Sequence, residues 1–161
     1  DHENVRPDIL ILGKALSGGV VPVSAVLADD YIMMNIKPGE HGSTFGGNPI
    51  AAKVSMAALQ VIKDENLMEK AEYLGNIFRE EMRKIDSPMI ELVRGKGLLN
   101  AVIIKPKDGK EAWDVCMKMK ENGVLAKPTH QHIIRFAPPL VITEEELRAA
   151  IEIIKETILS F

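Results

Sequence analysis

The sequence has 161 residues, of which 46% are hydrophobic and 27% charged, with a formal net charge of −3. These values are ordinary for a globular protein with one domain or two small ones, and the mild acidity argues against nucleic acid or an anionic membrane as a partner. No apolar run reaches membrane-spanning length. The single cysteine, Cys116, cannot form an internal disulfide, which favours a reducing compartment. Because the chain begins at Asp1 without a methionine, we expect it to be a piece of a longer protein.

A short apolar strand followed by a lysine is the first predicted element. Residues 9–12 are aliphatic and bounded by Gly13, a pattern typical of a strand buried on both faces. Lys14 stands where this strand ends. A desolvated lysine amine can act as a nucleophile toward an aldehyde and form a Schiff base. At this point two interpretations of Lys14 stay open, a surface lysine in a turn and a reactive amine.

A second apolar strand is expected over residues 21–28, followed by a short helix through residues 31–33 that Asp29 or Asp30 can cap. A glycine-rich loop follows and carries Ser43 and Thr44. Asn48 and Pro49 have the pattern of an N-cap followed by a first-turn proline, which predicts a helix over residues 49–64. This helix is apolar nearly all round and is therefore expected to be buried.

The loop before that helix has the features of an anion site. Glycines free its backbone amides, Ser43 and Thr44 supply hydroxyls, and the helix start supplies a positive dipole end. A flexible loop with a good cap is the alternative. A nucleoside-phosphate loop around Lys14 is excluded, because Asp8 and Ala15 occupy positions that need glycine and a hydroxyl residue.

The second half of the chain predicts alternating helices and strands. Apolar residues at steps of three and four indicate an amphipathic helix over residues 67–85. Strands are expected over residues 90–94, 98–105, 124–127 and 132–137. A helix over residues 110–122 is expected to turn Trp113, Cys116 and Met117 inward, and Thr143 with Glu146 forms the capping box of a last helix.

These elements predict two units. Residues 66–161 form an α+β domain with an antiparallel sheet covered on one face by helices. Residues 1–65 hold only two strands and one long helix, too little for an independently stable sheet. We therefore expect residues 1–65 to be the C-terminal part of a larger α/β domain.

Arginines and histidines on the predicted strands are further candidates. Arg135 lies inside an apolar strand and needs a partner, either a substrate carboxylate or an internal salt bridge. Arg94 has the same ambiguity, with Glu91 close in sequence. His130 and His132 lie two apart, but no third ligand stands at useful spacing, so no metal site is expected.

Several stretches resemble the class III, fold-type I pyridoxal-phosphate aminotransferases. Residues 12–19 read Leu-Gly-Lys-Ala-Leu-Ser-Gly-Gly, and residues 42–49 read Gly-Ser-Thr-Phe-Gly-Gly-Asn-Pro. Residues 94–100 read Arg-Gly-Lys-Gly-Leu-Leu-Asn. The Lys-Pro-Thr-His of residues 127–130 and the Arg-Phe-Ala-Pro-Pro of residues 135–139 are most similar to the ornithine aminotransferases. Acetylornithine and 4-aminobutyrate aminotransferases are the nearest alternatives.

The resemblance implies a fold and a set of roles. The fold would be α/β, with residues 1–65 the C-terminal part of the large pyridoxal 5'-phosphate domain and residues 66–161 a small α+β domain. Lys14 would carry the cofactor covalently and move the substrate proton. Thr44, helped by Ser43, would bind the cofactor phosphate of the neighbouring subunit, so that the site needs a homodimer. Arg135 would pair with the carboxylate of the 2-oxo acid.

The implied reaction transfers the δ-amino group of ornithine to 2-oxoglutarate, giving glutamate 5-semialdehyde and glutamate, in the cytoplasm or the mitochondrial matrix. The family's aspartate at the pyridine nitrogen, its ring-stacking aromatic residue and its second phosphate loop would all lie before residue 1. Without that aspartate the cofactor is a poor electron sink, so the 161-residue chain alone is expected to be inactive. The alternative outside the enzymes is a non-catalytic domain that retains the fold.

Overall fold

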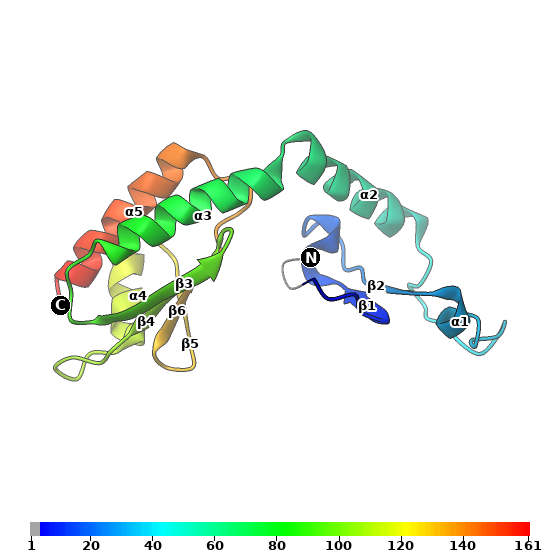
Figure 1. The fold of residues 1–161 in the computed structure, drawn as a ribbon, viewed down its shortest axis with the longest axis horizontal. Coiled ribbons are helices and arrows are strands. Elements are labelled where there is room, and N and C mark those ends of the chain that lie inside the picture. The colour runs from blue at the N-terminus through cyan, green and yellow to red at the C-terminus, as the bar shows by residue number, and fades with distance from the viewer. Residues whose placement is uncertain (1–3) are drawn as a thin grey trace. The chain divides into compact units, whose positions relative to one another are not determined.

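The computed structural model describes residues 4–161 (Figure 1). The chain divides into two compact units, Asp1–Glu65 and Asn66–Phe161, which are described separately. Within the described residues, no helix is both long enough and apolar enough to cross a membrane.

The first unit consists of a two-stranded ribbon, two short helical turns and one long helix. Strand β1 (Ile9–Leu12) pairs antiparallel with β2 (Ala25–Ala28), so that Leu12 lies opposite Ala25. The 3₁₀ helix η1 (Lys14–Ser17) and the extended segment after it connect the two strands. Helix α1 (Asp30–Met33) follows β2, and α2 (Pro49–Asp64) has the predicted bounds. The second strand is shorter than predicted, because residues 21–24 do not pair.

The expected burial of the first unit is wrong for this chain. Ile11 in β1 is 74% exposed, and Ile50 and Met56 in α2 are 70% and 61% exposed. The physical reason is that a ribbon of two strands has too few neighbours to cover its faces. Ser55, which is 9% exposed, is the only buried residue of α2. The apolar side chains of β1 and α2 therefore form an exposed surface that no other part of the described chain covers.

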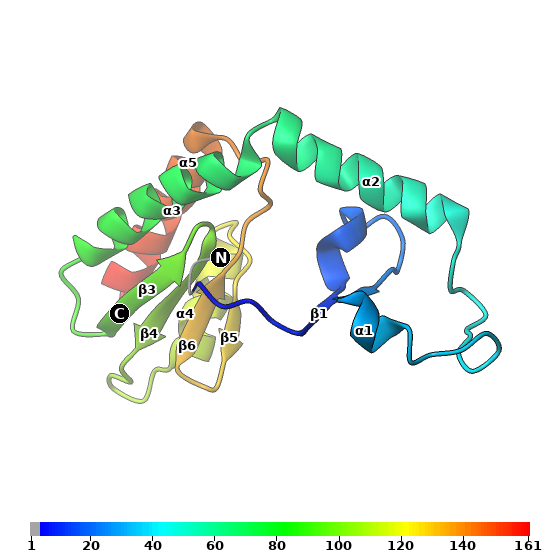
Figure 2. The same ribbon diagram turned by 45° about the vertical axis from the view of Figure 1, so that its right-hand side comes forward.

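The second unit is a four-stranded antiparallel sheet with three helices (Figures 1 and 2). Its strands are β3 (Ile90–Lys96), β4 (Leu99–Ile104), β5 (Lys127–Thr129) and β6 (Ile133–Phe136), in the order β3-β4-β6-β5. Its helices are α3 (Leu67–Arg83), α4 (Ala112–Glu121) and α5 (Glu144–Leu159). The predicted antiparallel sheet with a helix-covered face is confirmed.

One face of this sheet forms the core with the helices. Val93, Val102 and Ile134 share one cross-strand row and are buried against the helices. Every buried apolar side chain among the described residues lies between Leu67 and Ile158. Because side chains alternate along a strand, the neighbouring rows point to the opposite, helix-free face.

Helix α4 is rotated relative to the sequence prediction. Cys116 is buried as expected, but Trp113 is 61% exposed and Met117 38% exposed. The buried positions are Ala112, Val115, Cys116 and Met119, a set with helical spacing. The prediction placed Trp113 on the buried face because of its size. In the structure, the buried face is instead the one that carries the smaller residues Ala112, Val115 and Cys116.

Candidate active-site residues

Lys14 stands at the end of β1 in a left-handed backbone conformation. It is the first residue of η1 and has φ +51°, whereas Gly13 before it is extended. A non-glycine residue in this region is strained by about 1 kcal/mol. The Lys14 side chain is exposed, and no hydrogen bond or ion pair to Nζ occurs within residues 4–161. The turn therefore presents a free amine directly after the strand.

Ser17 holds this turn, and sequence reasoning did not identify it. Ser17 is fully buried; its hydroxyl donates to the carbonyl of Val21 and accepts from the Val21 amide at 3.2 Å. Gly18 has φ +65°, and a Cβ there would lie 3.4 Å from Ala58 of α2. Its small size thus allows the turn to approach α2. The sequence signal was a serine followed by two glycines, a pattern that favours hydroxyl-closed turns.

The N-terminus of α2 is occupied by its own cap. Asn48 Oδ1 accepts from the amides of Ile50 at 2.9 Å and Ala51 at 3.4 Å, and Pro49 has no amide hydrogen. The cap is confirmed. The amides of Ile50 and Ala51 are therefore engaged by the cap and are not free to bind an anion. Only the dipole of the helix remains available there.

Ser43 and Thr44 supply the donors that remain in this loop. Both are exposed, and neither hydroxyl makes a hydrogen bond to residues 4–161. Ser43 lines an open hollow of about 670 Å³ together with Ser24, Asn48 and other residues of this unit, but neither Lys14 nor Thr44 lines it. This hollow therefore does not bring Ser43 together with Lys14 or Thr44.

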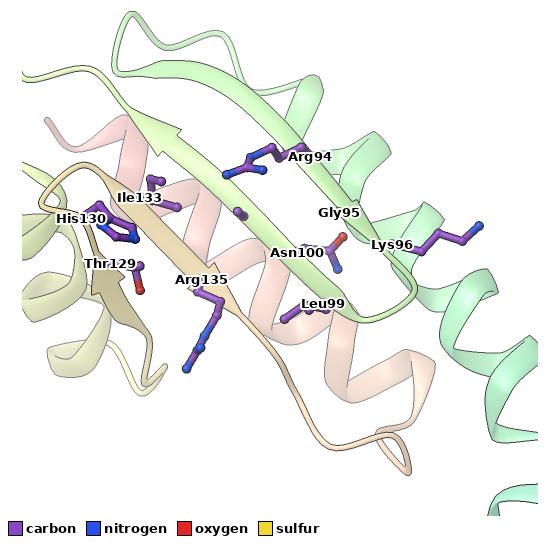
Figure 3. Close-up of a pocket in the computed structure, with 10 residues that line it drawn as sticks. Arg94, Gly95, Lys96, Leu99, Asn100, Thr129, His130, Ile133 and Arg135 are labelled. Carbon is purple, nitrogen blue, oxygen red and sulfur yellow. The ribbon is translucent and has the colours of Figure 1, made fainter. Parts of the chain in front are cut away.

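Arg135 projects from the helix-free face of the second unit. The strand register places Arg94, Ala101, Arg135 and Lys127 in one cross-strand row. Arg94 and Arg135 line an open hollow of about 560 Å³ with Thr129, His130 and other residues, none of them acidic (Figure 3). Lys127 lies directly opposite Arg135, an unfavourable pairing of like charges in the absence of an anion.

The internal salt bridge that was the alternative for Arg135 is not formed within residues 4–161. Arg94 is unpaired in the same way, because Glu91 lines a different hollow with His132 and others. Lys96, on the rim of the Arg135 hollow, instead pairs with Glu72 at 3.2 Å and points away in Figure 3. The helix-free face thus offers guanidinium groups to an acidic ligand.

His130 lines the hollow of Arg94 and Arg135, whereas Cys116 and His41 do not. Burial raises the pKa of the Cys116 thiol to about 11, which keeps it protonated and unreactive near neutral pH. His41 lies in the exposed loop before α2. His130 and Gln131, at the β5–β6 turn, both have positive φ. Among the described residues, no three side chains of the metal-binding types gather in one place.

Comparison with known proteins gives the family. The family model "Aminotransferase class-III" matches residues 1–158. The chain belongs to the class III aminotransferase family. Members of this family work with pyridoxal phosphate, and the resemblance that the motifs suggested is thereby confirmed.

Individual class III relatives match over nearly the whole chain. The mitochondrial ornithine aminotransferase of Rattus norvegicus is 60% identical over 161 residues, which is 100% of this chain and 37% of the rat protein. The Schizosaccharomyces pombe ornithine aminotransferase is 58% identical over 160 residues, 98% of this chain and 36% of that protein. The chain therefore spans little more than a third of the length of these relatives.

Solved class III structures have the same fold. An acetylornithine aminotransferase from Elizabethkingia anophelis superposes with a TM-score of 0.93 at 62% identity, over 99% of this chain and 41% of that one. An ornithine aminotransferase from Toxoplasma gondii gives 0.93 at 52% identity, over 99% of this chain and 38% of that one, and is described with partial occupancy of PLP at its active site. The predicted fold class is confirmed.

Proposed function

We propose that this chain forms part of a pyridoxal-phosphate-dependent ornithine δ-aminotransferase that uses 2-oxoglutarate as amino acceptor. The observation that carries the proposal is Lys14, an unpaired amine held in a strained turn directly after a strand. Relatives named ornithine aminotransferase, 54–60% identical over most or all of the chain, support the choice of donor. The δ-amino group leaves ornithine as its carbon becomes an aldehyde, and 2-oxoglutarate becomes glutamate.

The side chains of the first unit fit the cofactor in chemical type. Bound pyridoxal phosphate supplies a carbonyl that takes up the amino group and an electron sink for the carbon that loses its proton. Lys14 would hold the cofactor through Nζ, and its amine would serve as the base and acid that moves a proton at the reacting carbon of the substrate. Ser17 and Gly18 keep the turn in the conformation that presents Nζ.

Ser43 and Thr44 bind the cofactor phosphate of a neighbouring subunit in this proposal. Their hydroxyls are free, and the Asn48-capped helix start adds a favourable dipole without competing donors. Lys14 does not line the hollow that Ser43 lines, which agrees with a division of the two roles between subunits. The active enzyme is then a homodimer or a larger homo-oligomer.

Arg135 binds a carboxylate of the 2-oxo acid. Its guanidinium lies on a face with further cations, Arg94 and Lys127 in the same row, and no acidic residue lines the hollow. A planar guanidinium matches a carboxylate with two parallel hydrogen bonds. A substrate carboxylate would also relieve the repulsion between Arg135 and Lys127.

Acetylornithine is the second candidate donor, because the Elizabethkingia acetylornithine aminotransferase is 62% identical to this chain. Relatives with and without the word mitochondrial in their names match at similar identity, so the proposed compartment is the mitochondrial matrix or the cytoplasm.

The test is an amino-donor panel with the full-length enzyme, which contains this chain and the remaining length seen in its relatives. Glutamate 5-semialdehyde should form from ornithine and 2-oxoglutarate with a kcat/KM at least about tenfold above that for acetylornithine or 4-aminobutyrate, a difference of about 1.4 kcal/mol in transition-state binding. A preference for acetylornithine would transfer the assignment to that activity. Full-length protein without cofactor absorbance would instead favour a non-catalytic domain.

A further inference from the structure

A buried arginine on α3 connects this helix to the β3–β4 turn. Arg79 is only 6% exposed, and its Nη1 donates to the Gly97 carbonyl at 2.9 Å and to Asn100 Oδ1 at 2.8 Å. Its Nη2 donates to Asn76 Oδ1 at 2.6 Å and to Glu72 Oε1 at 3.3 Å. A buried ion pair is costly to desolvate, and replacing both partners with apolar side chains of similar volume is often neutral for stability. Stability alone is therefore a poor explanation for Arg79.

Asn100 is the strand residue that this arginine fixes. It is 2% exposed, accepts from Arg79 and donates Nδ2 to the Gly97 carbonyl at 3.2 Å, so that both ends of its amide are held. A Cβ on Gly95 would lie 2.2 Å from Asn100 Oδ1, so glycine at 95 leaves room for this amide. In the sheet register, Asn100 lies between Gly95 and Phe136.

Phe136 is the residue directly after Arg135. It is 7% exposed and pairs with Asn100 across β4 and β6. Its ring lies against that of Phe78, with centroids 5.1 Å apart and planes at 49°. Phe78 and Arg79 are consecutive on α3. The helix therefore contacts Phe136 directly through Phe78, and it is connected to Phe136 indirectly through Arg79 and its hydrogen bond to Asn100.

The guanidinium of Arg135 is not held by side-chain partners in the way that the guanidinium of Arg79 is. Its guanidinium forms no ion pair within residues 4–161, and its strand is held by Ile134 and Phe136, which point into the core on either side of it. The direction in which Arg135 leaves the sheet is therefore set by the backbone, and the backbone by the contacts of α3.

We propose that Arg79 and Asn100 are positioning residues, which act through Phe136 to aim Arg135 at the carboxylate of the 2-oxo acid. The inference rests on the proposed function, because it presumes that Arg135 binds this carboxylate. Glu72, whose pKa is lowered chiefly by its hydrogen bond from Lys96, completes the support of Arg79 at 3.3 Å. A misplacement of about 1 Å in a binding group can cost up to a hundredfold in rate.

The primary test is Arg79→Met in the full-length holoenzyme. Methionine fills similar space but leaves the buried acceptors of Asn100 and Gly97 without the Arg79 donor, so the thermal midpoint should fall while the protein stays folded. The KM for 2-oxoglutarate should rise about tenfold, and the single-turnover rate with ornithine should change less than about twofold. A structural role alone would move the thermal midpoint without this split.

Asn100→Ala removes the strand partner of the same hydrogen bond. It should likewise raise the KM for 2-oxoglutarate and leave the single-turnover rate with ornithine nearly unchanged. Asn122→Ala is the matched control, because it removes a side-chain hydrogen bond of 2.9 Å to Thr157 away from β6. The control should lower the thermal midpoint and leave the KM for 2-oxoglutarate unchanged.

The Arg135→Gln variant distinguishes failure of the positioning role of Arg79 and Asn100 from failure of the proposed role of Arg135. If Arg135→Gln raises the KM for 2-oxoglutarate and both Arg79→Met and Asn100→Ala leave it at the wild-type value, the positioning inference is overturned and the proposed function stands. A fall of both half-reactions by equal factors in the folded variants would also overturn it. If Arg135→Gln itself leaves the KM unchanged, the proposed role of Arg135 has failed.

Discussion

Lys14 and Arg135 share one property at the scale of single residues. Each is a cation with no ion-pair partner within residues 4–161, and each stands at a place where the backbone leaves it little freedom. Lys14 is held in a left-handed turn closed by Ser17, and Arg135 lies between two core-facing residues of β6. Free charge on a fixed backbone is what a binding or catalytic group requires.

Arg135→Gln in the full-length enzyme should raise the KM for 2-oxoglutarate about a hundredfold, because the two-point guanidinium–carboxylate contact is lost. The bound cofactor and the half-reaction with ornithine should be retained. Steady-state kinetics and the cofactor absorbance measure both.

Arg94→Gln is the control for that variant, since Arg94 lies in the same row and lines the same hollow. We expect its KM within about threefold of the wild-type value. Equal losses in the two variants would assign the binding to the charge of the whole row rather than to Arg135.

Cys116 should be unreactive in the folded chain. Burial raises the pKa of its thiol from 9.0 to about 11, so that at pH 8 the thiolate fraction is roughly a hundredfold lower than in the unfolded protein. A colourimetric disulfide reagent at pH 8 should react slowly with native protein and rapidly after addition of guanidinium chloride. Equal rates in the two states would show that the thiol is accessible.

The sequence predicted Lys14 and Arg135 as candidates because each interrupts an apolar strand pattern or follows its end. It did not predict Ser17, Arg79 or Asn100, because their importance arises from contacts between elements. The Arg79–Asn100 contact, for example, joins residues 21 positions apart. Trp113 was misplaced for a related reason, since a bulky apolar residue favours burial only if its helical face is covered.

At the scale of elements, α3 packs closely against the β3–β4 turn. A Cβ on Gly75 of α3 would lie 1.8 Å from the Gly97 carbonyl oxygen and 2.9 Å from Arg79 Nη1. Gly97 itself has φ +53°. The helix and the turn can therefore pack only while Gly75 lacks a side chain.

Gly75→Ala should destabilise the protein by about 3 kcal/mol, although alanine in a helix is normally favoured over glycine by about 1 kcal/mol. The clash with backbone is the reason for the reversed sign. Urea unfolding measures it, with the exposed Glu80→Ala on the same helix as the control, which should lie within about 0.5 kcal/mol of the wild type. A stabilised Gly75→Ala variant would contradict the packing described here.

At the scale of the whole molecule, the two units differ in what they can stabilise alone. The second has a continuous core from Ala71 to Ile158, whereas the first exposes most of its apolar side chains. The sequence predicted the strands, the long helix and the Asn48 cap of the first unit, because these depend on local signals. Its burial could not be predicted, because burial depends on neighbours that the chain does not supply.

Hydrogen exchange of the 161-residue chain should reflect this difference. Amides in β3, β4, β6 and α5 should be protected close to the global limit, and those in β1 and α2 should exchange through local opening at least about tenfold faster. Mass spectrometry of peptic peptides resolves the two regions. Equal protection would show that the first unit is stabilised by contacts within the chain.

The central claim is that Lys14 carries the cofactor, and borohydride reduction of the full-length holoenzyme tests it most directly. Reduction fixes the cofactor to the amine that binds it, and peptide mapping then identifies that amine. We expect a single modified peptide that contains Lys14, and no modification in a Lys14→Ala variant. Label on any other lysine, or retention of label in that variant, would contradict it.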